Sequence, residues 1–163
     1  MAIRSLLLRL SLALALFCAL APASRAQLSR LKFGSYKISS ISPRSLRSCD
    51  GAVQVSVRND TVGFVMRNIS GLVYRSGVPF VTGQASDVDV RPGRNTLVVP
   101  GNVTLCDGVS LWTILGLLFS FDINEYTADL RLTLTTDTGD SRVIEEKGMS
   151  VAAVLGNRFK RKK

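Results

Sequence analysis

The chain has 163 residues, with 21 lysines and arginines against 12 aspartates and glutamates, no histidine, and a formal net charge of +9. The lack of histidine excludes Ser-His-Asp and Cys-His catalysis and every zinc site that needs an imidazole ligand. Fingerprints of phosphate-cradling loops, dinucleotide sites and nucleophile elbows are also missing from the sequence. Composition therefore indicates a protein that is not an enzyme, with no catalytic residue, no metal and no cofactor.

The first 26 residues have the layout of a secretory signal peptide. Arg4 precedes an apolar run over residues 10–21, and small residues lead to Ala26 before Gln27. This layout predicts cleavage after Ala26 and export to the periplasm, the envelope or the medium. The alternative is an uncleaved membrane anchor, but the run is much shorter than the roughly 20 residues that a spanning helix needs. We therefore expect one domain over residues 27–157, followed by a basic tail over 158–163.

The positive charge lies mainly at the two ends of the chain. Three arginines belong to the signal segment, and five cations crowd the last six residues: Arg158, Lys160, Arg161, Lys162 and Lys163. Residues 27–157 then carry only +1 and lack a basic stripe interleaved with aromatics, so no specific nucleic-acid surface is predicted. The tail is suited to weak contact with anionic lipid or an envelope polymer. The alternative is a solvated terminus that aids solubility.

Residues 27–157 repeatedly show the period-two alternation of half-buried β-strands. Val53, Val55 and Val57, for example, alternate with polar residues, which places them on one dry face. The predicted strands cover residues 31–42, 52–59, 62–74, 78–90, 95–105, 126–136 and 141–154. Turn-forming residues separate most of them, and Pro100-Gly101 within a strand indicates an edge or a bulge. The fold class predicted is all-β: an antiparallel fibronectin/immunoglobulin-like β-sandwich of about seven strands.

One segment, residues 109–121, interrupts this alternation. It carries no charge and gathers its small and polar residues on one face at helical spacing, which predicts a short, mostly buried helix near 109–121. Asp107 or Ser110 can cap its start. The alternative is a helix that docks on a membrane or a partner, with Trp112 as a surface contact. We expect the helix to close one end of the sandwich, because interfacial helices usually carry lysine or arginine on the polar face.

Two cysteines, Cys49 and Cys106, remain after removal of Cys18 with the signal segment. Each begins a Cys-Asp-Gly tripeptide, which is typical of a turn. Two thiolates without histidine make a poor metal site, and their wide spacing is not that of a redox motif. In an exported protein an even number of cysteines favours a disulfide, so we predict a bond that joins the two turns.

A few carboxylates are spaced so that a catalytic pair or a metal site can be considered. Asp87 and Asp89 lie on one face of a predicted strand, while Asp122 and Glu125 flank the end of the predicted helix. A glycosidase pair or a calcium site is conceivable on such residues. The preferred interpretation is solvation of loops and strand edges. The stretch TTDTGDS over 135–141 resembles half of a calcium loop but matches a hairpin turn better.

The order of residues in VQVSVRNDTVGFVMRNISGLVYRSGVPFVTGQASDVDVRPGRNTLVVPGNVTL resembles the second group of late embryogenesis abundant proteins, the water stress and hypersensitive response (WHy) domain. The likeness extends over about Leu31 to Val154. The matching positions are Asn59, Gly77, Gly83, Pro92-Gly93 and Val98-Val99-Pro100. The Asn-Pro-Asn of that family reads Asn59-Asp60-Thr61 here. The resemblance implies a fibronectin-like β-sandwich, no catalytic residues, and a role in stress protection or accessory binding.

Together these features predict an exported, non-enzymatic β-sandwich protein with a stress-protective or macromolecule-binding role in the cell envelope. Its partner would be an envelope protein or polymer, with weak contact to anionic lipid and no specific nucleic acid. The alternative function is a peripheral membrane or surface adaptor, anchored by the basic tail and by the apolar segment around Trp112.

Overall fold

The structure is a computed structural model that describes residues 31–117 and 119–153. Its helical elements are α2 (Leu111–Gly116) and the short 3-10 turn η3 (Ile123–Glu125). Its strands are β1 (Leu31–Pro43), β2 (Ser48–Asn59), β3 (Phe64–Arg75), β4 (Val78–Ala85), β5 (Val88–Val90), β6 (Gly93–Leu105), β7 (Tyr126–Thr136) and β8 (Ser141–Ser150). The predicted signal segment with its cleavage at Ala26, and the basic tail, lie outside the described residues.

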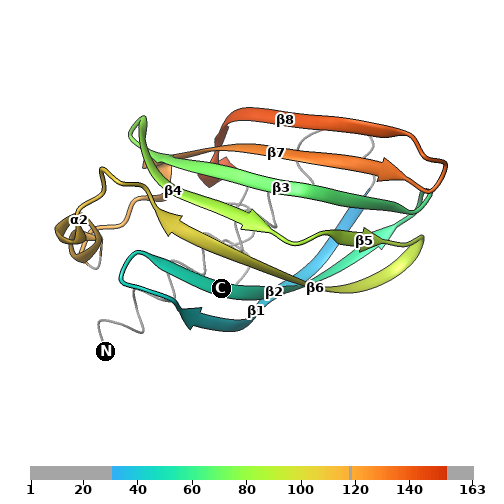
Figure 1. Cartoon of the computed structure of the whole chain (residues 1–163), viewed down its shortest axis with the longest axis horizontal. Coiled ribbons are helices and arrows are strands. Elements are labelled where there is room, and N and C mark those ends of the chain that lie inside the picture. Colours follow the sequence, from blue (N-terminus) through green and yellow to red (C-terminus); the bar gives the residue numbers. More distant parts are fainter. Residues whose placement is uncertain (1–30, 118, 154–163) are drawn as a thin grey trace.

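All strands join one antiparallel sheet in the order β1-β2-β6-β4-β3-β7-β8, with the short β5 paired to β3. The sheet curls so strongly that β1 and β2 come to lie beneath the other strands (Figure 1). The predicted all-β class with antiparallel pairing is confirmed. Hydrogen bonding joins all the described strands into a single curled sheet. Both sides of the core are formed by this one sheet, so the two separate sheets of the predicted sandwich are not confirmed.

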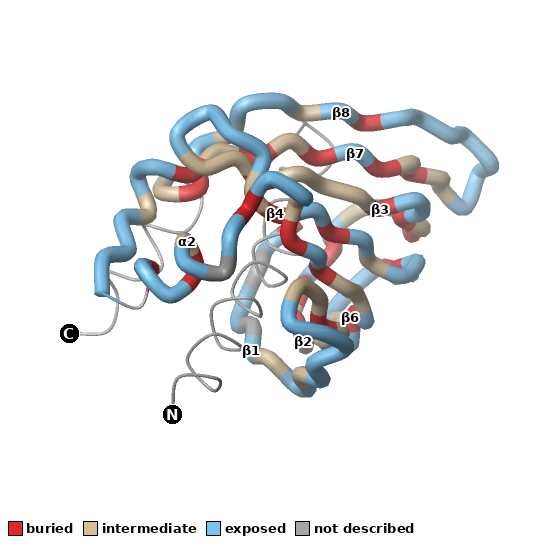
Figure 2. The backbone as a smooth tube through the Cα atoms, turned by 60° about the vertical axis from the view of Figure 1, so that its left-hand side comes forward, coloured by how far each residue is buried: buried red, intermediate tan, exposed pale blue. Residues whose placement is uncertain are grey.

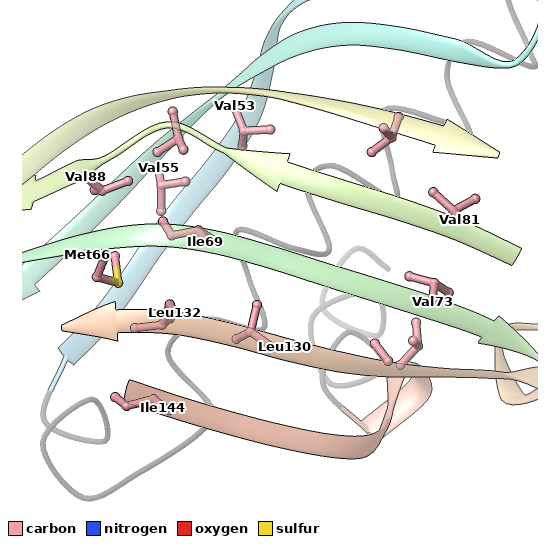
Figure 3. Packing of buried hydrophobic residues seen from close by; sticks show 14 of the residues in the cluster. Val53, Val55, Met66, Ile69, Val73, Val81, Val88, Leu130, Leu132 and Ile144 are labelled. Atoms are coloured by element: carbon pink, nitrogen blue, oxygen red, sulfur yellow. The ribbon is translucent and has the colours of Figure 1, made fainter. Parts of the chain in front are cut away.

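The core lies on the inner side of this curl. Alternate residues of each long strand point inward, and Val53, Leu130 and Leu132 are almost fully buried, with 0–2% of their surface exposed. Figure 3 shows Val53, Leu130 and Leu132 together with Val73 of β3 and Val81 of β4. All five belong to one cluster of buried residues. The period-two pattern read from the sequence thus corresponds to this one packed face.

Three strand predictions need correction. The strand predicted over 141–154 ends at Ser150, as β8, and residues 151–153 are helical. Residues 78–90 form two strands, β4 and β5, because the chain turns away from β6 at Ser86 and Asp87 and pairs again only with β3. Pro100 lies neither at an edge nor in a bulge, since β6 is central and its register with β2 is unbroken. The missing N–H of Pro100 is tolerated because pairing with β4 ends beside it, at Gly101.

The turn that follows β2 depends on a buried asparagine. Asn59 is only 1% exposed. Its Oδ1 accepts from the backbone N–H of Thr61 at 2.9 Å, and its Nδ2 donates to the Val62 carbonyl at 2.9 Å. These bonds close an Asx-type turn that satisfies the polar atoms of the buried amide. The predicted end of the second strand at Asn59 is confirmed.

Candidate functional site

Four large apolar side chains are exposed together around α2, and we name them the α2 patch. The exposed fractions are 81% for Trp112, 41% for Leu115, 91% for Phe119 and 44% for Phe121. They belong to a stretch, 109–121, without a single charge. Figure 2 shows α2 projecting from the sheet with much of its surface exposed. Single exposed apolar residues are ordinary, but four within ten residues of the chain are typical of a binding surface.

Capping and two buried anchors determine which face of α2 is exposed. The Ser110 hydroxyl oxygen accepts from the Thr113 backbone N–H at 3.1 Å, which confirms one of the two predicted caps. Ile114 and Leu117, with 4% and 6% exposed, point toward the protein. With about 3.6 residues per turn, Trp112 and Leu115 therefore lie on the opposite face and point to solvent.

An arginine from a distant turn holds the loop that leads into α2. Arg47, between β1 and β2, donates from Nη1 to the Val109 carbonyl at 3.0 Å and from Nη2 to the Cys106 carbonyl. The Arg47 carbonyl in turn accepts from the Leu105 N–H at 2.8 Å. Because a guanidinium presents several donors in one plane, it binds both carbonyls and keeps the loop in one conformation.

Aromatic contacts hold the other end of the patch. The ring of Phe121 stacks on Tyr126 with 5.3 Å between centroids, and Tyr126 meets Phe80 edge-on at 5.8 Å. Tyr126 itself is 5% exposed. The segment after α2 is thus attached to β7 and β4 through rings, and such pairs add about 1 kcal/mol each beyond their area burial.

The predicted short helix near 109–121 is present, but the prediction that it is mostly buried is wrong. The helix covers only Leu111–Gly116, and Trp112 and Phe119 are among the most exposed apolar residues described. The physical reason is that the curled sheet already buries its inner face against itself, so it needs only two residues of α2 as a cover. Trp112 is exposed, as the alternative of a helix that docks on a membrane or a partner requires. The other five predicted contact residues lie outside the described residues: Arg158, Lys160, Arg161, Lys162 and Lys163.

The charged residues nearest to the α2 patch along the chain are acidic. Asp107 precedes α2 and Asp122 follows the patch, and both are exposed. The Asp122 carboxylate accepts from the Asn124 N–H at 2.9 Å and so begins η3. Glu125 pairs with Arg75 at 3.0 Å. The patch is therefore an apolar surface with carboxylates at its margin.

The predicted disulfide between Cys49 and Cys106 is not formed, because both residues are free thiols in the structure. Cys49 lies directly opposite Val103 in the register of β2 and β6, and Cys106 follows Val103 by three positions. Three residues of strand advance about 10 Å, which exceeds the roughly 7 Å between Cα atoms that a disulfide tolerates. Burial, assisted by Asp50, raises the pKa of the Cys49 thiol; burial, assisted by Asp107, raises that of Cys106.

The carboxylates considered as catalytic or calcium-binding residues are separated and engaged elsewhere. Asp87 pairs with Arg67 at 3.6 Å and Asp89 with Arg91 at 3.7 Å. Within residues 31–117 and 119–153, no three Cys, Asp or Glu side chains are grouped so as to hold a metal ion. Thr136–Asp140 forms a hairpin turn, in which the Thr136 N–H donates to the Asp140 carbonyl at 2.9 Å, in agreement with the preferred interpretation.

No known family model and no curated protein matches the chain. It is similar to several solved structures, among them the following three. A protein from Archaeoglobus fulgidus has 16% identity and a TM-score of 0.42 over 72% of this chain and 94% of that one. A glycoside hydrolase family 2 β-glucuronidase has 12% identity and a TM-score of 0.32, over 71% of this chain but only 11% of the enzyme. A FixG-related protein from Vibrio parahaemolyticus has 12% identity and a TM-score of 0.29, over 74% and 96%.

These likenesses are too distant to assign a function. In the part of the chain that the structure describes, no helix is both long and apolar enough to cross a bilayer.

The sequence pattern singled out Trp112 but missed Phe119, Phe121 and the role of Arg47. The uncharged stretch was a usable signal for the two phenylalanines, whereas nothing local to Arg47 indicates a contact with residues about 60 positions away.

Proposed function

We propose that the protein is an exported, non-enzymatic binding protein that protects other envelope proteins by holding their exposed apolar segments on the α2 patch. The single observation that carries this proposal is the exposure of Trp112 and Phe119, at 81% and 91%, on α2 and the residues after it, while Arg47 holds the loop that leads into α2. Aromatic side chains bind apolar partners with little loss of conformational freedom. A patch that is already ordered binds without the cost of ordering a loop.

The charge pattern favours a protein partner over a membrane. Peripheral helices that insert into anionic bilayers carry lysine and arginine beside their apolar face. Around the α2 patch, Asp107 and Asp122 occupy the margin, and residues 109–121 include no cation. Carboxylates there repel anionic headgroups and attract the basic residues that flank apolar segments in client proteins. Export rests on the signal layout, and the protective role agrees with the family resemblance.

The proposal is tested by freezing and thawing lactate dehydrogenase with the purified protein, against an equal mass of albumin. We expect recovered activity above the albumin control for the unmodified chain, and recovery at the albumin level for the double variant Trp112→Ser/Phe119→Ser. Val143→Ser is the matched control, because Val143 is an apolar residue of β8 that is 55% exposed away from α2. It should protect as well as the unmodified chain.

Equal protection by the double variant would contradict a role for the α2 patch. A parallel arm measures Trp112 fluorescence with vesicles of neutral and of anionic lipid. A blue shift with anionic vesicles that is lost at high salt would instead support the peripheral membrane adaptor with its basic tail. Unchanged fluorescence with both vesicles, together with protection, is the outcome expected for the protein-binding function.

A further inference from the structure

Three cations form a row near one end of the sheet: Lys32 near the start of β1, Arg58 near the end of β2 and Arg94 near the start of β6. These ends of the three strands lie away from α2 (Figure 1). Lys32 of β1 lies directly opposite Arg58 of β2, and Arg58 lies directly opposite Arg94 of β6. Residues directly opposite in antiparallel strands point to the same face. Leu31 and Asn59 beside them are buried, whereas Lys32, Arg58 and Arg94 are exposed, so the row lies on the solvent side.

One carboxylate compensates part of this charge. Asp60 accepts from Arg58 Nε at 2.8 Å and lies 3.3 Å from Lys32 Nζ. The hydrogen bonds from Arg58 and Lys32 hold the pKa of Asp60 below its usual value. Arg94 forms no ion pair with any residue the structure describes. Because like charges directly opposite destabilise a strand pair, the row costs stability that an anionic ligand would offset.

A second row, of hydroxyl groups, lies next to the cations on the same face. Ser56 of β2 is directly opposite Thr96 of β6, and its Oγ lies 3.3 Å from the Oγ of Ser35 in β1. The following row brings another cation, Lys37, opposite Gln54. On the outer face of β1, β2 and β6 a row of cations is thus followed by a row of hydroxyl groups, and then by Lys37, Gln54 and the exposed Val98 of β6. Hydroxyl and amide groups both donate and accept hydrogen bonds.

The cationic row ends at a shallow hollow of about 560 Å³ between two turns. Arg58, Asn59, Gly93 and Arg94 line it from β2 and β6, and Asp60, Thr61 and Pro92 line it from the turns after β2 and before β6. A guanidinium binds a carboxylate through two parallel N–H groups. Because Asp60 already engages Arg58, Arg94 is the guanidinium of this hollow that suits a planar acid group.

We propose that this face binds an acidic polysaccharide, with sugar carboxylates at Arg94 and Lys37 and sugar hydroxyls along Ser35, Ser56 and Thr96. The neighbouring cations and hydroxyl groups match a polymer that repeats acid and hydroxyl groups. Nucleic acid fits less well, because none of the residues in these rows is aromatic and single-stranded bases need rings on which to stack. The inference is independent of the α2 patch, which lies at the other end of the sheet.

The test measures binding of the full chain to polygalacturonate at about 50 mM salt, where exposed charges are little screened, with dextran as the neutral polymer and duplex DNA as the nucleic acid. Arg94→Gln and Lys37→Gln should each weaken binding by about fivefold, as expected for one exposed ion pair. The double variant should weaken it by more than tenfold. The matched control is Arg131→Gln/Arg142→Gln, which removes the same charge from exposed positions in β7 and β8.

The control variant should bind within twofold of the unmodified chain, and dextran should not bind. Because every variant keeps the basic tail, any contribution from Arg158–Lys163 is common to all of them. Equal weakening by the control variant would reduce the effect to net charge and overturn the proposal. So would tighter binding of DNA than of polygalacturonate, or no binding to polygalacturonate. Retained binding by Trp112→Ser/Phe119→Ser is expected, and its loss would contradict the independence of the two surfaces.

Discussion

Arg47 donates from Nη1 to the carbonyl oxygen of Val109 at 3.0 Å, across 62 positions of sequence. This bond and its companion to Cys106 join the turn between β1 and β2 to the loop that begins the α2 patch. An exposed aromatic surface on a loose loop would collapse onto the protein or pay an ordering cost on binding. The arginine therefore allows the patch to remain both ordered and exposed.

The first prediction concerns this clamp. Arg47→Ala leaves the Val109 carbonyl without its Arg47 donor and the Cys106 carbonyl with the Val109 N–H as its donor, and we expect the free energy of unfolding to fall by about 1–3 kcal/mol. Hydrogen exchange should also accelerate at the amides of 109–117. Urea denaturation and exchange mass spectrometry measure the two effects. Arg44→Ala, which removes an exposed pair with Asp50, should cost less than about 1 kcal/mol. Equal losses in the two variants would contradict a special role for Arg47.

The second prediction concerns the thiols. Burial raises the pKa of Cys49 and of Cys106, and a raised pKa leaves less reactive thiolate at a given pH. We therefore expect slow alkylation by iodoacetamide in the native protein at about pH 8, faster alkylation as pH rises, and complete alkylation of both after denaturation without a reductant. Peptide mass spectrometry measures each site. A cross-linked Cys49–Cys106 peptide in the unreduced protein would restore the disulfide that the β2–β6 register opposes.

The third prediction is a pH dependence. The folded pKa of Asp60 is lowered by hydrogen bonds from Arg58 and Lys32, so its stabilising contribution is present above the unfolded pKa and is lost as pH falls through the folded pKa. Asp60→Asn should therefore lower the melting temperature at pH 7 but not at about pH 2. Thermal unfolding over this range measures the difference. A deficit that persists unchanged at the lowest pH would show that charge is not its source.

The fourth prediction concerns the core. Leu132 in β7 is 0% exposed, so Leu132→Ala should reduce the free energy of unfolding by about 2–5 kcal/mol. Val143 in β8 lies opposite the neighbouring Thr133 and is 55% exposed. Val143→Ala should cost less than about 1 kcal/mol, as surface substitutions usually do. Urea denaturation compares the two variants, and similar midpoints would contradict the assignment of the inner face.

Local sequence patterns predicted most of the strands because the order of polar and apolar residues in a strand reflects which of its faces is buried. The alternation of Val53, Val55 and Val57 reflects one buried and one solvated face wherever the strand lies in the sheet. Turn residues such as Ser76 and Gly77, both at positive φ, indicate a hairpin for an equally local reason. Ser110 capped α2 as expected, since a cap acts within a single turn of helix.

Properties that depend on register and neighbours could not be read in this way. The Cys49 and Cys106 pairing failed because parity of cysteines says nothing about a register that places Val103, not Cys106, opposite Cys49. The prediction that the helix is mostly buried was wrong because the apolar area that a helix must cover depends on how far the sheet curls. The cationic row could not be predicted from the sequence because Lys32, Arg58 and Arg94 are widely separated along the chain.

Side-chain polarity and backbone preference over a few residues account for the all-β class, the positions of most strands and turns, and the uncharged stretch that includes Trp112. Three features are visible only in the folded protein: Trp112 and Phe119 face solvent, Arg47 holds the loop before α2, and the cations of β1, β2 and β6 align. Strand order and register produce those relationships, and both are set by the packing of the whole sheet.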